Sequence, residues 1–513
     1  MRPDRPQFLA WNAECFLAWG TAAMQSVEQA DSSKWMALLT VAVGYFGVQL
    51  AMTSVPPMLP TVAQLFEADV TRTSWTMTAY FLTITGCMLM AGRLGDLLGY
   101  TRIFACGMVI YSATTLACGL AQSMAQLIVF RGLQGVGGAL VFGNSLAIVT
   151  NAFPASQRGR AVGALAMVSA LGAMLGTALG SVAVQLGAWR WAFFLVLPLG
   201  IAAALMAFAL GQRDSTAQLA RMSQGRRFDI AGGILLLVML SALSLGLSHL
   251  HGGEPSFTAG WLYHLPLFSL ALYCLITFVV VESRASTPLV PLERFGNGAF
   301  TGAVLGNLIL HMTMLGVFFL TPFFMERGLQ MPAGYVAVLL TSQQFYNVII
   351  SYASGWLYDK THSRWIRPVG MALICFGFFL LSLIAPVLTF TTYMLVSLPI
   401  GIGMGTFMSV NNTVIMSSVP ASLRGFASGM LETTRQAGHM FAVPLTSGIM
   451  TAVTGATLTT QTAPILYIQG FQAACLVVGC IGLVAVVSAF IPDRQRQTFA
   501  KDMATSPLPA QRR

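Results

Sequence analysis

Charged residues are scarce in this chain: Lys, Arg, Asp and Glu make up 9% of 513 residues, and only 17 residues are acidic. A soluble domain carries about 25% charged residues, so this chain lacks the side chains to cover a water-exposed surface. Hydrophobic residues reach 56% and recur in runs of about 20 residues, the length that crosses a bilayer as a helix. Backbone inside a bilayer must satisfy its own hydrogen bonds, which favours helices. The composition therefore indicates an all-α polytopic membrane protein.

Motifs for enzymatic chemistry are absent from the sequence. It has no glycine-rich P-loop for ATP, no HExxH zinc motif and no GxSxG nucleophile elbow. None of the eight cysteines forms a CxxC pair, and we interpret those in apolar runs as small packing residues. We therefore expect no enzymatic activity, no catalytic residues, no metal site and no cofactor.

The apolar runs predict how the chain crosses the membrane. We expect fourteen spans, at residues 36–58, 75–93, 103–123, 125–150, 161–183, 191–211, 229–249, 261–281, 298–320, 333–357, 367–388, 391–413, 426–453 and 467–491. With a cytoplasmic N-terminus, 22 of the 27 Lys and Arg residues fall on the cytoplasmic side and three fall outside. The positive-inside rule thus predicts a protein of the cell's inner membrane with both termini cytoplasmic. The net charge of +10 then faces anionic lipid headgroups, and no nucleic acid is needed to explain it.

Two sequence patterns return in the second half of the chain. FPASQRGRAVG at residues 153–163 matches VPASLRGFASG at 419–429 with an offset of 266, and GRLGD at 92–96 returns as GWLYD at 355–359 with an offset of 263. Such a repeat predicts two homologous halves around a central cavity. The predicted division is a cytoplasmic or interfacial segment at 1–35, a six-helix bundle at 36–211, a linker with two extra spans at 212–297, a second six-helix bundle at 298–492 and a cytoplasmic tail at 493–513.

Four motifs have the order and spacing of a known transporter family. They are WTMTAY at 75–80, GRLGDLLGYTR at 92–102, RGLQGVGGA at 131–139 and WRWAFFLVLPLG at 189–200. In these motifs the chain, over about residues 36–492, resembles the major facilitator superfamily and, within it, the fourteen-span drug:proton antiporters. The resemblance implies the major facilitator fold, with two six-helix bundles plus two central helices, and alternating access around a cavity at mid-membrane depth.

The stretch from Gly92 to Arg102 concentrates charge between two apolar runs. Its glycines allow a short turn and close helix approach, while Asp96 can cap the following helix or pair with nearby arginines. By resemblance, this loop and its repeat form a cytoplasmic latch that bridges the halves; the alternative is a positive-inside loop with a helix cap. The latch residues are Gly92, Arg93, Asp96, Gly99, Arg102, Gly355 and Asp359.

Arg131 lies well inside the fourth apolar run, where a charge is costly unless it faces a cavity or a partner. The resemblance implies a polar network with Gln134 that influences proton movement. The alternative is a side chain that extends toward the outer membrane surface.

Glycines recur every four residues in the fifth run, at Gly172, Gly176 and Gly180. This spacing predicts a smooth helix face for close contact with another helix. The pattern resembles the antiporter motif of the family, except that Thr177 and Ser181 stand where the family has proline and glycine. The kink attributed to that proline is therefore not expected here.

An embedded carboxylate is missing from the first run, where Ala51 stands at the position of an aspartate in the drug:proton antiporters. If protons drive transport, the group that carries them lies elsewhere. The best alternative is Glu432, Arg435 and His439, which fall on one helical face at i, i+3 and i+7. We expect this face to exchange protons or to bind a charged substrate; the alternative for the first two residues is a static ion pair.

Polar side chains in the second half are candidates for the lining of a substrate cavity, although amides also serve as hydrogen bonds between helices. They are Asn307, His311, Gln343, Gln344, Asn347, Asn411 and Asn412. For the histidine, packing inside an apolar run is the alternative. The 28 methionines and 33 phenylalanines suit an adaptable apolar cavity.

The sequence thus predicts a secondary transporter that exports small hydrophobic or cationic compounds in exchange for protons. One alternative is an uptake symporter or facilitator for a small organic solute, favoured by Ala51 and Thr177. Another is a non-transporting scaffold or receptor, which the repeated latch motif disfavours. The expected partners are a small-molecule substrate, protons and the lipid bilayer, with a periplasmic adaptor protein implied by the resemblance alone.

Overall fold

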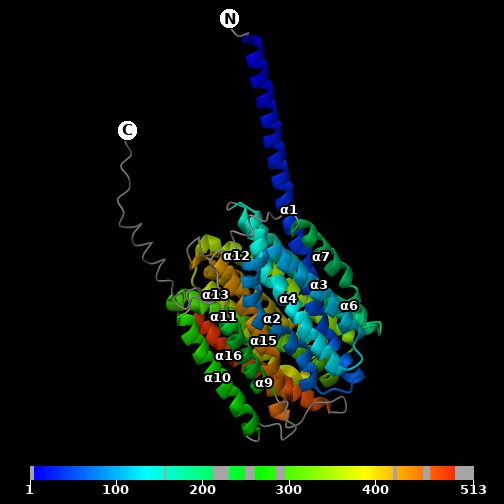
Figure 1. Cartoon of the computed structure of the whole chain (residues 1–513). Helices are drawn as coiled ribbons and strands as arrows, with labels where there is room; N and C mark the ends of the chain where they lie inside the picture. The colour runs from blue at the N-terminus through cyan, green and yellow to red at the C-terminus, as the bar shows by residue number, and fades with distance from the viewer. Residues whose placement is uncertain are drawn as a thin grey trace, which may run out of the picture.

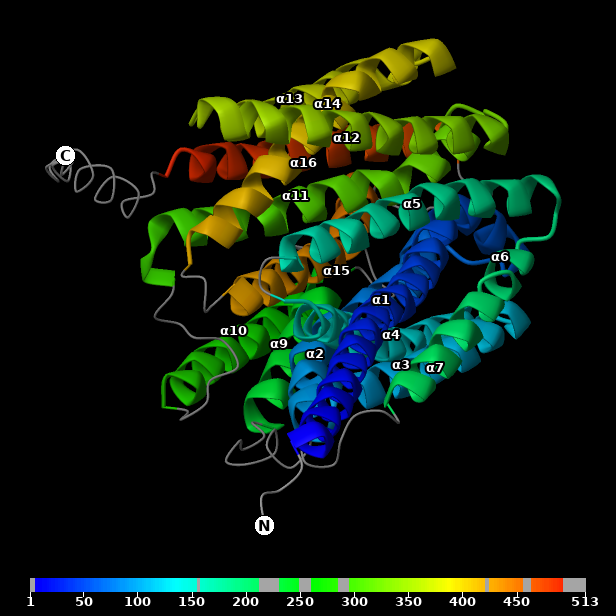
Figure 2. The ribbon, with the colours of Figure 1, turned by 90° about the horizontal axis from the view of Figure 1, so that it is seen from above.

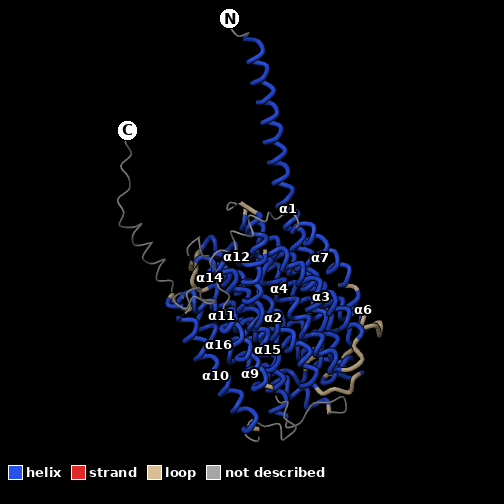
Figure 3. The backbone as a smooth tube through the Cα atoms, viewed as in Figure 1, coloured by secondary structure: helices blue, strands red, loops and turns tan. Residues whose placement is uncertain are grey.

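The structure is a computed structural model that describes residues 5–154, 157–211, 230–248, 260–284, 295–419, 424–454 and 463–491. Across these ranges the chain folds into helices and contains no strand (Figure 3). The predicted tail at 493–513 and the linker residues 212–229 lie outside the described residues. The all-α prediction is therefore confirmed for the part of the chain that can be described.

The helices follow one another with short connections. The N-terminal group consists of α1 (Arg5–Leu65), α2 (Val70–Leu98), α3 (Tyr100–Leu120), α4 (Met124–Ala152), α5 (Arg158–Gln185), α6 (Trp191–Phe194) and α7 (Leu197–Gly211). Two further helices follow, α9 (Ile230–Leu247) and α10 (Trp261–Arg284). The C-terminal group consists of α11 (Gly298–Phe323), η2 (Phe324–Gly328), α12 (Ala333–Thr361), α13 (Ile366–Ile384), η3 (Ala385–Val387), α14 (Phe390–Ser417), α15 (Arg424–Thr454) and α16 (Pro464–Ala489). Each of the fourteen predicted spans overlaps one of these helices, with α6 and α7 sharing the sixth span.

Eleven of the described helices are long and apolar enough to cross a membrane. The described part of α9 is apolar but shorter. The remaining two, α12 and α15, contain polar side chains such as Gln343, Gln344 and Glu432. Polar residues inside a membrane helix are expected to face a cavity or other protein groups rather than lipid, so these two helices point to the site.

The two groups of helices lie side by side (Figure 2). In that view α5 and α15 lie near the seam between them, where α5 packs against α12 and α15 packs against α2. Helix α9 contacts α2 of the N-terminal group, α15 of the C-terminal group and α10. The two helices between the groups, α9 and α10, therefore lie over one side of the boundary between them. Helix α1 continues without a break from Arg5, and Figure 1 shows its first part projecting beyond the end of the bundle. The exact boundaries between the predicted parts stay predictions.

The connection between α2 and α3 differs from the predicted loop. Helix α2 continues to Leu98 and α3 begins at Tyr100, so Gly99 alone separates them. Its φ of 98° lies in the region that favours glycine, and its N–H donates to the carbonyl of Gly95. The interpretation of Asp96 as a cap for α3 is wrong, because Gly99 occupies the N-cap position and no side chain caps it.

The glycine face of α5 lies against α1. A Cβ added at Gly172, Gly176 or Gly180 would come within 2.0 to 3.0 Å of a backbone carbonyl oxygen of α1, closer than side chains tolerate. Helix α5 runs unbroken past Thr177, whose hydroxyl donates to the carbonyl of Ala173 at 3.1 Å. Close backbone approach of this kind is how small residues bring membrane helices together.

Candidate functional site

A cavity of about 1130 Å³ lies between the two groups of helices. Its walls come from α1, α2, α4 and α5 on one side and from α11, α12, α14 and α15 on the other. It extends along the bundle to Arg93, Asp96 and the solvent-exposed Asn151, at the end where α2 meets α3. Much of the wall is apolar and flexible, formed by Met52, Met88, Leu89, Phe142, Leu146, Leu165, Met314, Leu315, Phe318, Met404 and Met408.

The opposite end of the seam is closed by hydrogen bonds between the two groups. Arg327 on η2 donates from Nη2 to Oε1 of Gln64 on α1 at 2.7 Å. The hydroxyls of Thr71 on α2 and Thr451 on α15 lie 3.2 Å apart. Because none of these four residues lines the cavity, the cavity reaches one end of the bundle and stops short of the other.

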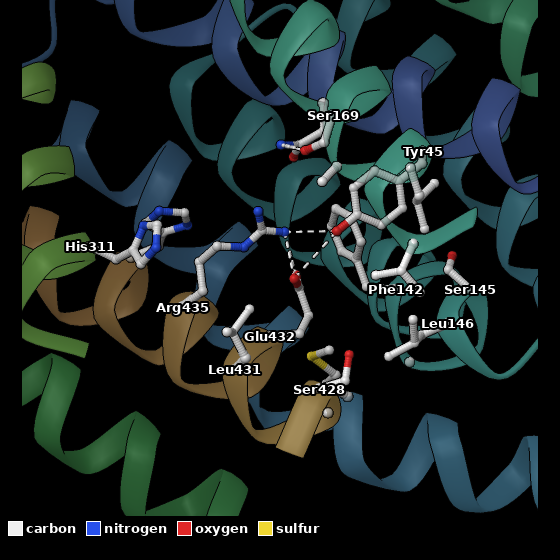
Figure 4. Close-up of a pocket in the computed structure, with 18 of the residues that line it drawn as sticks. Tyr45, Phe142, Ser145, Leu146, Ser169, His311, Ser428, Leu431, Glu432 and Arg435 are labelled. Carbon is white, nitrogen blue, oxygen red and sulfur yellow. Dashed lines mark hydrogen bonds and ion pairs between the residues drawn. The ribbon is translucent and has the colours of Figure 1, made fainter. Parts of the chain in front are cut away.

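An ion pair on α15 occupies the middle of the cavity wall (Figure 4). Arg435 Nη2 lies 2.6 Å from Glu432 and also donates to the hydroxyl of Tyr45 at 2.8 Å. That tyrosine, on α1, donates in turn to Glu432 Oε2 at 3.3 Å, and Gln436 donates to Oε1 at 2.8 Å. The cluster therefore joins the C-terminal group to the N-terminal group through a single tyrosine hydroxyl.

Two histidines lie beside this pair. His311 on α11 and His439 on α15 both line the cavity, and their rings meet edge to face with centroids 5.0 Å apart. Phe81, from α2 of the other group, packs on His439 with centroids 5.1 Å apart. Nδ1 of His439 is buried without a hydrogen-bond partner. The predicted face of Glu432, Arg435 and His439 thus lies on the cavity, and His311 joins it.

The predicted cavity amides divide into two sets. Gln343, Gln344 and Asn347 on α12 and Asn412 on α14 line the cavity. Within the described part of the chain, the two glutamine side chains make no hydrogen bond, and Oδ1 of Asn412 is buried without a partner.

Asn307 and Asn411 do not line the cavity, contrary to the prediction. Nδ2 of Asn307 donates to the carbonyl of Leu431 at 2.9 Å and to the hydroxyl of Thr434 at 2.8 Å, which links α11 to α15. Nδ2 of Asn411 donates to the carbonyl of Ala303 at 2.9 Å, which links α14 to α11. Both amides face neighbouring helices, because buried polar groups seek a partner where they cannot reach water.

Arg131 is fully buried inside the N-terminal group and does not extend to the membrane surface. Its Nε donates to the carbonyl of Thr76 at 3.1 Å, its Nη1 donates to Gln134 at 2.5 Å, and its guanidinium lies 4.0 Å from the ring centre of Tyr80. Nε2 of Gln134 donates in turn to the hydroxyl of Thr115 at 2.6 Å, which extends the network. The structure therefore brings Arg131 and Gln134 together but separates them from the cavity and from Glu432.

Two contacts of the predicted latch residues lie inside the N-terminal group. Arg93 lies 3.5 Å from Asp96, and the hydroxyl of Tyr100 also donates to that carboxylate. Arg102 and Asp359 are exposed. At Gly355 an added Cβ would lie 2.9 Å from the hydroxyl of Ser409 on α14, so this position packs two helices of the same group.

Ala51 is fully buried and does not line the cavity, whereas its neighbours Met52 and Thr53 do. On the same wall Gln49 donates to the hydroxyl of Ser169 at 2.8 Å, which ties α1 to α5. Among the described residues, no group of three His, Cys, Asp or Glu side chains is placed to hold a metal ion.

Sequence reasoning did not identify Tyr45 as a site residue. The signal was present, because a tyrosine inside an apolar span needs a partner for its hydroxyl. The sequence does not show that this partner lies 387 residues away on another helix.

Comparison with known proteins places the chain in a family. The family model described as Major Facilitator Superfamily matches residues 41–443. The multidrug transporter protein MdtP of Bacillus subtilis (strain 168) is 30% identical over 83% of this chain and 78% of its own length. The riboflavin transporter RibZ of Clostridioides difficile (strain 630) is 28% identical over 78% of this chain and 85% of its own length.

An exporter and a solved transporter structure are also similar to the chain. The tetracenomycin C resistance and export protein of Streptomyces glaucescens is 28% identical over 82% of this chain and 77% of its own length. Among solved structures, a bacterial homolog of the human lysosomal transporter Spinster, inward-facing and unoccupied, superposes with a TM-score of 0.60 at 17% identity, covering 93% of this chain and 99% of its own. The family match covers well over half of the chain, which therefore belongs to the Major Facilitator Superfamily.

Proposed function

We propose that this protein exports small hydrophobic compounds from the cytoplasm in exchange for protons, by alternating access around the cavity. The cavity carries the proposal: it lies between two groups of helices, reaches one end of the bundle and is closed by interhelical hydrogen bonds at the other. Transporters that rock two halves around a central site have this arrangement. Relatives named for multidrug transport and for tetracenomycin C resistance and export support the direction and the substrate class.

The distribution of charge supports a cytoplasmic location for the open end. The end where α2 meets α3 carries Arg93 and Arg102, and 22 of the 27 Lys and Arg residues fall on that side of the predicted spans. By the positive-inside rule this end faces the cytoplasm of the cell that carries the protein in its membrane. The structure then corresponds to a state that loads substrate from inside.

Proton exchange is assigned to the groups at the middle of the cavity. Of the described residues that line it, two carry carboxylates, Asp96 at the cytoplasmic end and Glu432 at mid-depth. Glu432 contacts both groups of helices through Arg435 and Tyr45. A change in its protonation would weaken the ion pair and the link to α1 together, which would couple proton binding to rearrangement of the halves.

The latch role of the Asp96 region belongs to the opposite state. Here Asp96 pairs with Arg93 and Tyr100 of its own group. We infer that closure of the cytoplasmic end would bring this carboxylate against the C-terminal group.

An uptake symporter or facilitator is the second candidate. It is favoured by Ala51, which leaves the first span without the usual carboxylate, and one relative is named as a riboflavin transporter. A cationic substrate, expected from the resemblance, would have to compete with Arg435 for Glu432.

The test uses inverted membrane vesicles that hold a proton gradient reported by a pH-sensitive dye. Hydrophobic neutral, anionic and cationic compounds are added to vesicles with wild type, Glu432→Gln or Glu67→Gln. The last variant is a matched control, because Glu67 is exposed between α1 and α2 and outside the cavity. We expect compound-triggered loss of the gradient in wild type and Glu67→Gln, and none in Glu432→Gln.

Each other outcome has a defined meaning. Gradient loss that persists in Glu432→Gln would retain antiport and move the coupling site to His311 or His439. No response to any compound would contradict antiport and favour uptake or facilitated diffusion.

A further inference from the structure

The carboxylates of the cavity are already occupied by groups of the protein. Glu432 accepts hydrogen bonds from Arg435, Gln436 and Tyr45. Asp96 accepts from Arg93 and from the hydroxyl of Tyr100. A positively charged compound entering the cavity would therefore meet no carboxylate that lacks a partner among the described lining residues, and it would have to displace an arginine first.

The guanidinium of Arg435 has N–H donors that make no hydrogen bond with described residues. All its hydrogen bonds to described residues are made by Nη2, which contacts Glu432 and Tyr45. Nε is buried without a partner, and Nη1 makes no hydrogen bond with a described residue. Figure 4 shows one nitrogen directed toward the glutamate and the tyrosine, while the rest of the guanidinium is turned away from them. A guanidinium presents five N–H donors, so most of this one's capacity is unused.

Histidine and amide side chains also line the cavity that Arg435 lines. His311 makes no hydrogen bond with a described residue, and its ring contacts that of His439. The side-chain amides of Gln343 and Gln344 line the same cavity. The cavity wall thus combines a positive charge that lacks part of its hydrogen bonding with histidine and amide groups that can donate.

We propose that the cavity binds hydrophobic compounds that end in an anionic oxygen group, a carboxylate or a phenolate, with this group hydrogen-bonded to Arg435 Nη1. This proposal rests on the proposed function only in placing the substrate in this cavity. The ligand body would lie against Phe142, Phe318 and the five methionines that line the cavity, Met52, Met88, Met314, Met404 and Met408. Methionine side chains adapt to differently shaped ligands, so the anionic end would supply orientation while the apolar wall accepts varied bodies.

The proposal also explains why the ion pair is incomplete. Glu432 holds Arg435 by one nitrogen and fixes its orientation, with the Tyr45 hydroxyl as a second support. The Nη1 donors then keep one position at the cavity, as preorganised recognition of a carboxylate requires. Tyr45 and Glu432 act here as positioning residues for the arginine.

The experiment measures binding of three matched probes by calorimetry to the full chain in lipid nanodiscs. The probes are 2-naphthoic acid, 2-naphthamide and 2-naphthylmethylamine, which share one body and carry a carboxylate, a neutral amide and an ammonium group at neutral pH. Empty nanodiscs correct for partition into lipid. We expect the acid to bind at least tenfold more tightly than the amide and the amine.

Variants assign the preference to a residue. We expect the preference for the acid to vanish when Arg435→Gln is combined with Glu432→Gln, a pair of changes that leaves no buried charge unpaired. Arg435→Lys keeps the charge but not the fork of donors, and should retain a reduced preference. Arg72→Gln, at a side chain that is 73% exposed, is the matched control and should behave as wild type.

Failure of this inference is distinguishable from failure of the proposed function. Tighter binding of the amine, or a preference for the acid that survives in the double variant, would overturn the role of Arg435 while the vesicle assay still decides on transport. Absence of binding by all three probes, together with gradient loss driven by cationic compounds in vesicles, would overturn the anionic class and leave export intact.

Discussion

Arg131 and Arg435 are both arginines held within membrane-spanning helices, and their surroundings differ in three respects. Arg131 is fully buried among α2 and α4 of one group, where it contacts a backbone carbonyl, an amide and an aromatic ring. Arg435 lines the cavity, pairs with a carboxylate and reaches a tyrosine on the other group. Each has a buried nitrogen without a hydrogen bond, but only Arg435 lines the cavity.

The comparison distinguishes two kinds of polar side chain. One kind holds helices of the same bundle together, and the other kind acts between the N-terminal and C-terminal groups of helices. In the proposed alternating access, interactions inside one group need not change, so the hydrogen bonds of Arg131 to Thr76 and Gln134 can persist. In the same proposed mechanism, interactions across the cavity would form and break in each cycle, and those of Arg435 leave part of its hydrogen bonding unused. The first kind is expected to govern stability and the second kind transport.

The largest effect on stability is expected for Arg131→Gln. The shorter side chain would leave the Thr76 carbonyl and the Gln134 amide oxygen without their donor, at about 1–3 kcal/mol for each buried group left unpaired. We expect a much lower melting temperature and poor recovery of monodisperse protein. Arg72→Gln is the control. A variant that melts like wild type but transports poorly would mean that Arg131 acts in transport, and the comparison would fail.

A second effect on stability is expected at the α1–α5 contact. In Gly180→Ala the new methyl would lie 2.0 Å from the carbonyl oxygen of Ser54, and such overpacking costs about 1–3 kcal/mol. Gly163→Ala on the same helix is the control, because an added Cβ there meets nothing within 4 Å. Thermal melting followed by fluorescence should separate the two variants. Equal melting temperatures would show that the contact is looser than described.

Asn307→Ala and Asn412→Ala test the same distinction, between stability and transport, inside the C-terminal group. Asn307 bonds to two groups of α15, so we expect its loss to cost about 1 kcal/mol for each hydrogen bond and to lower the melting temperature. Asn412 lines the cavity, so its loss should alter the apparent affinity for substrate and leave melting unchanged. The reverse pattern would contradict the assignment of these two amides.

A small change in stability, with a larger effect on transport, is expected for Tyr45→Phe. Phenylalanine keeps the ring contact with Phe142, whose centroid lies 4.7 Å away, but removes the hydroxyl between Arg435 and Glu432. Hydrogen bonds to charged groups contribute about 1.5–3 kcal/mol, and part of this is recovered by the remaining ion pair. We expect a severalfold loss of transport with little change in melting. Unchanged transport would show that the hydroxyl does not support the pair.

The fold was predictable because it follows from patterns that repeat along the chain. Apolar runs long enough to span a membrane located the helices, and the paired motifs at 92–96 and 355–359 indicated two halves. The α2–α3 connection was misjudged as a loop, since charged residues at a membrane surface can continue a helix as readily as end it. Only Gly99, with its positive φ, breaks the helix there.

The site was predictable in part. Spacing on one helix was enough to place Glu432, Arg435 and His439 on a common face. It could not show which amides turn toward the cavity, because Asn411 and Asn412 are adjacent in sequence and face different neighbours. It could not supply Tyr45 either, since contacts between distant helices depend on how the two groups pack.

The most direct test compares wild type with the double variant Glu432→Gln and Arg435→Gln in two assays on the same preparation. Replacing both members of a buried ion pair by neutral groups is often nearly neutral for stability, so the account predicts a melting temperature within a few degrees of wild type. It also predicts loss of compound-driven proton exchange after reconstitution. A variant that unfolds as readily as Arg131→Gln, or one that transports at the wild-type rate, would contradict the claim that this pair acts between the two groups of helices.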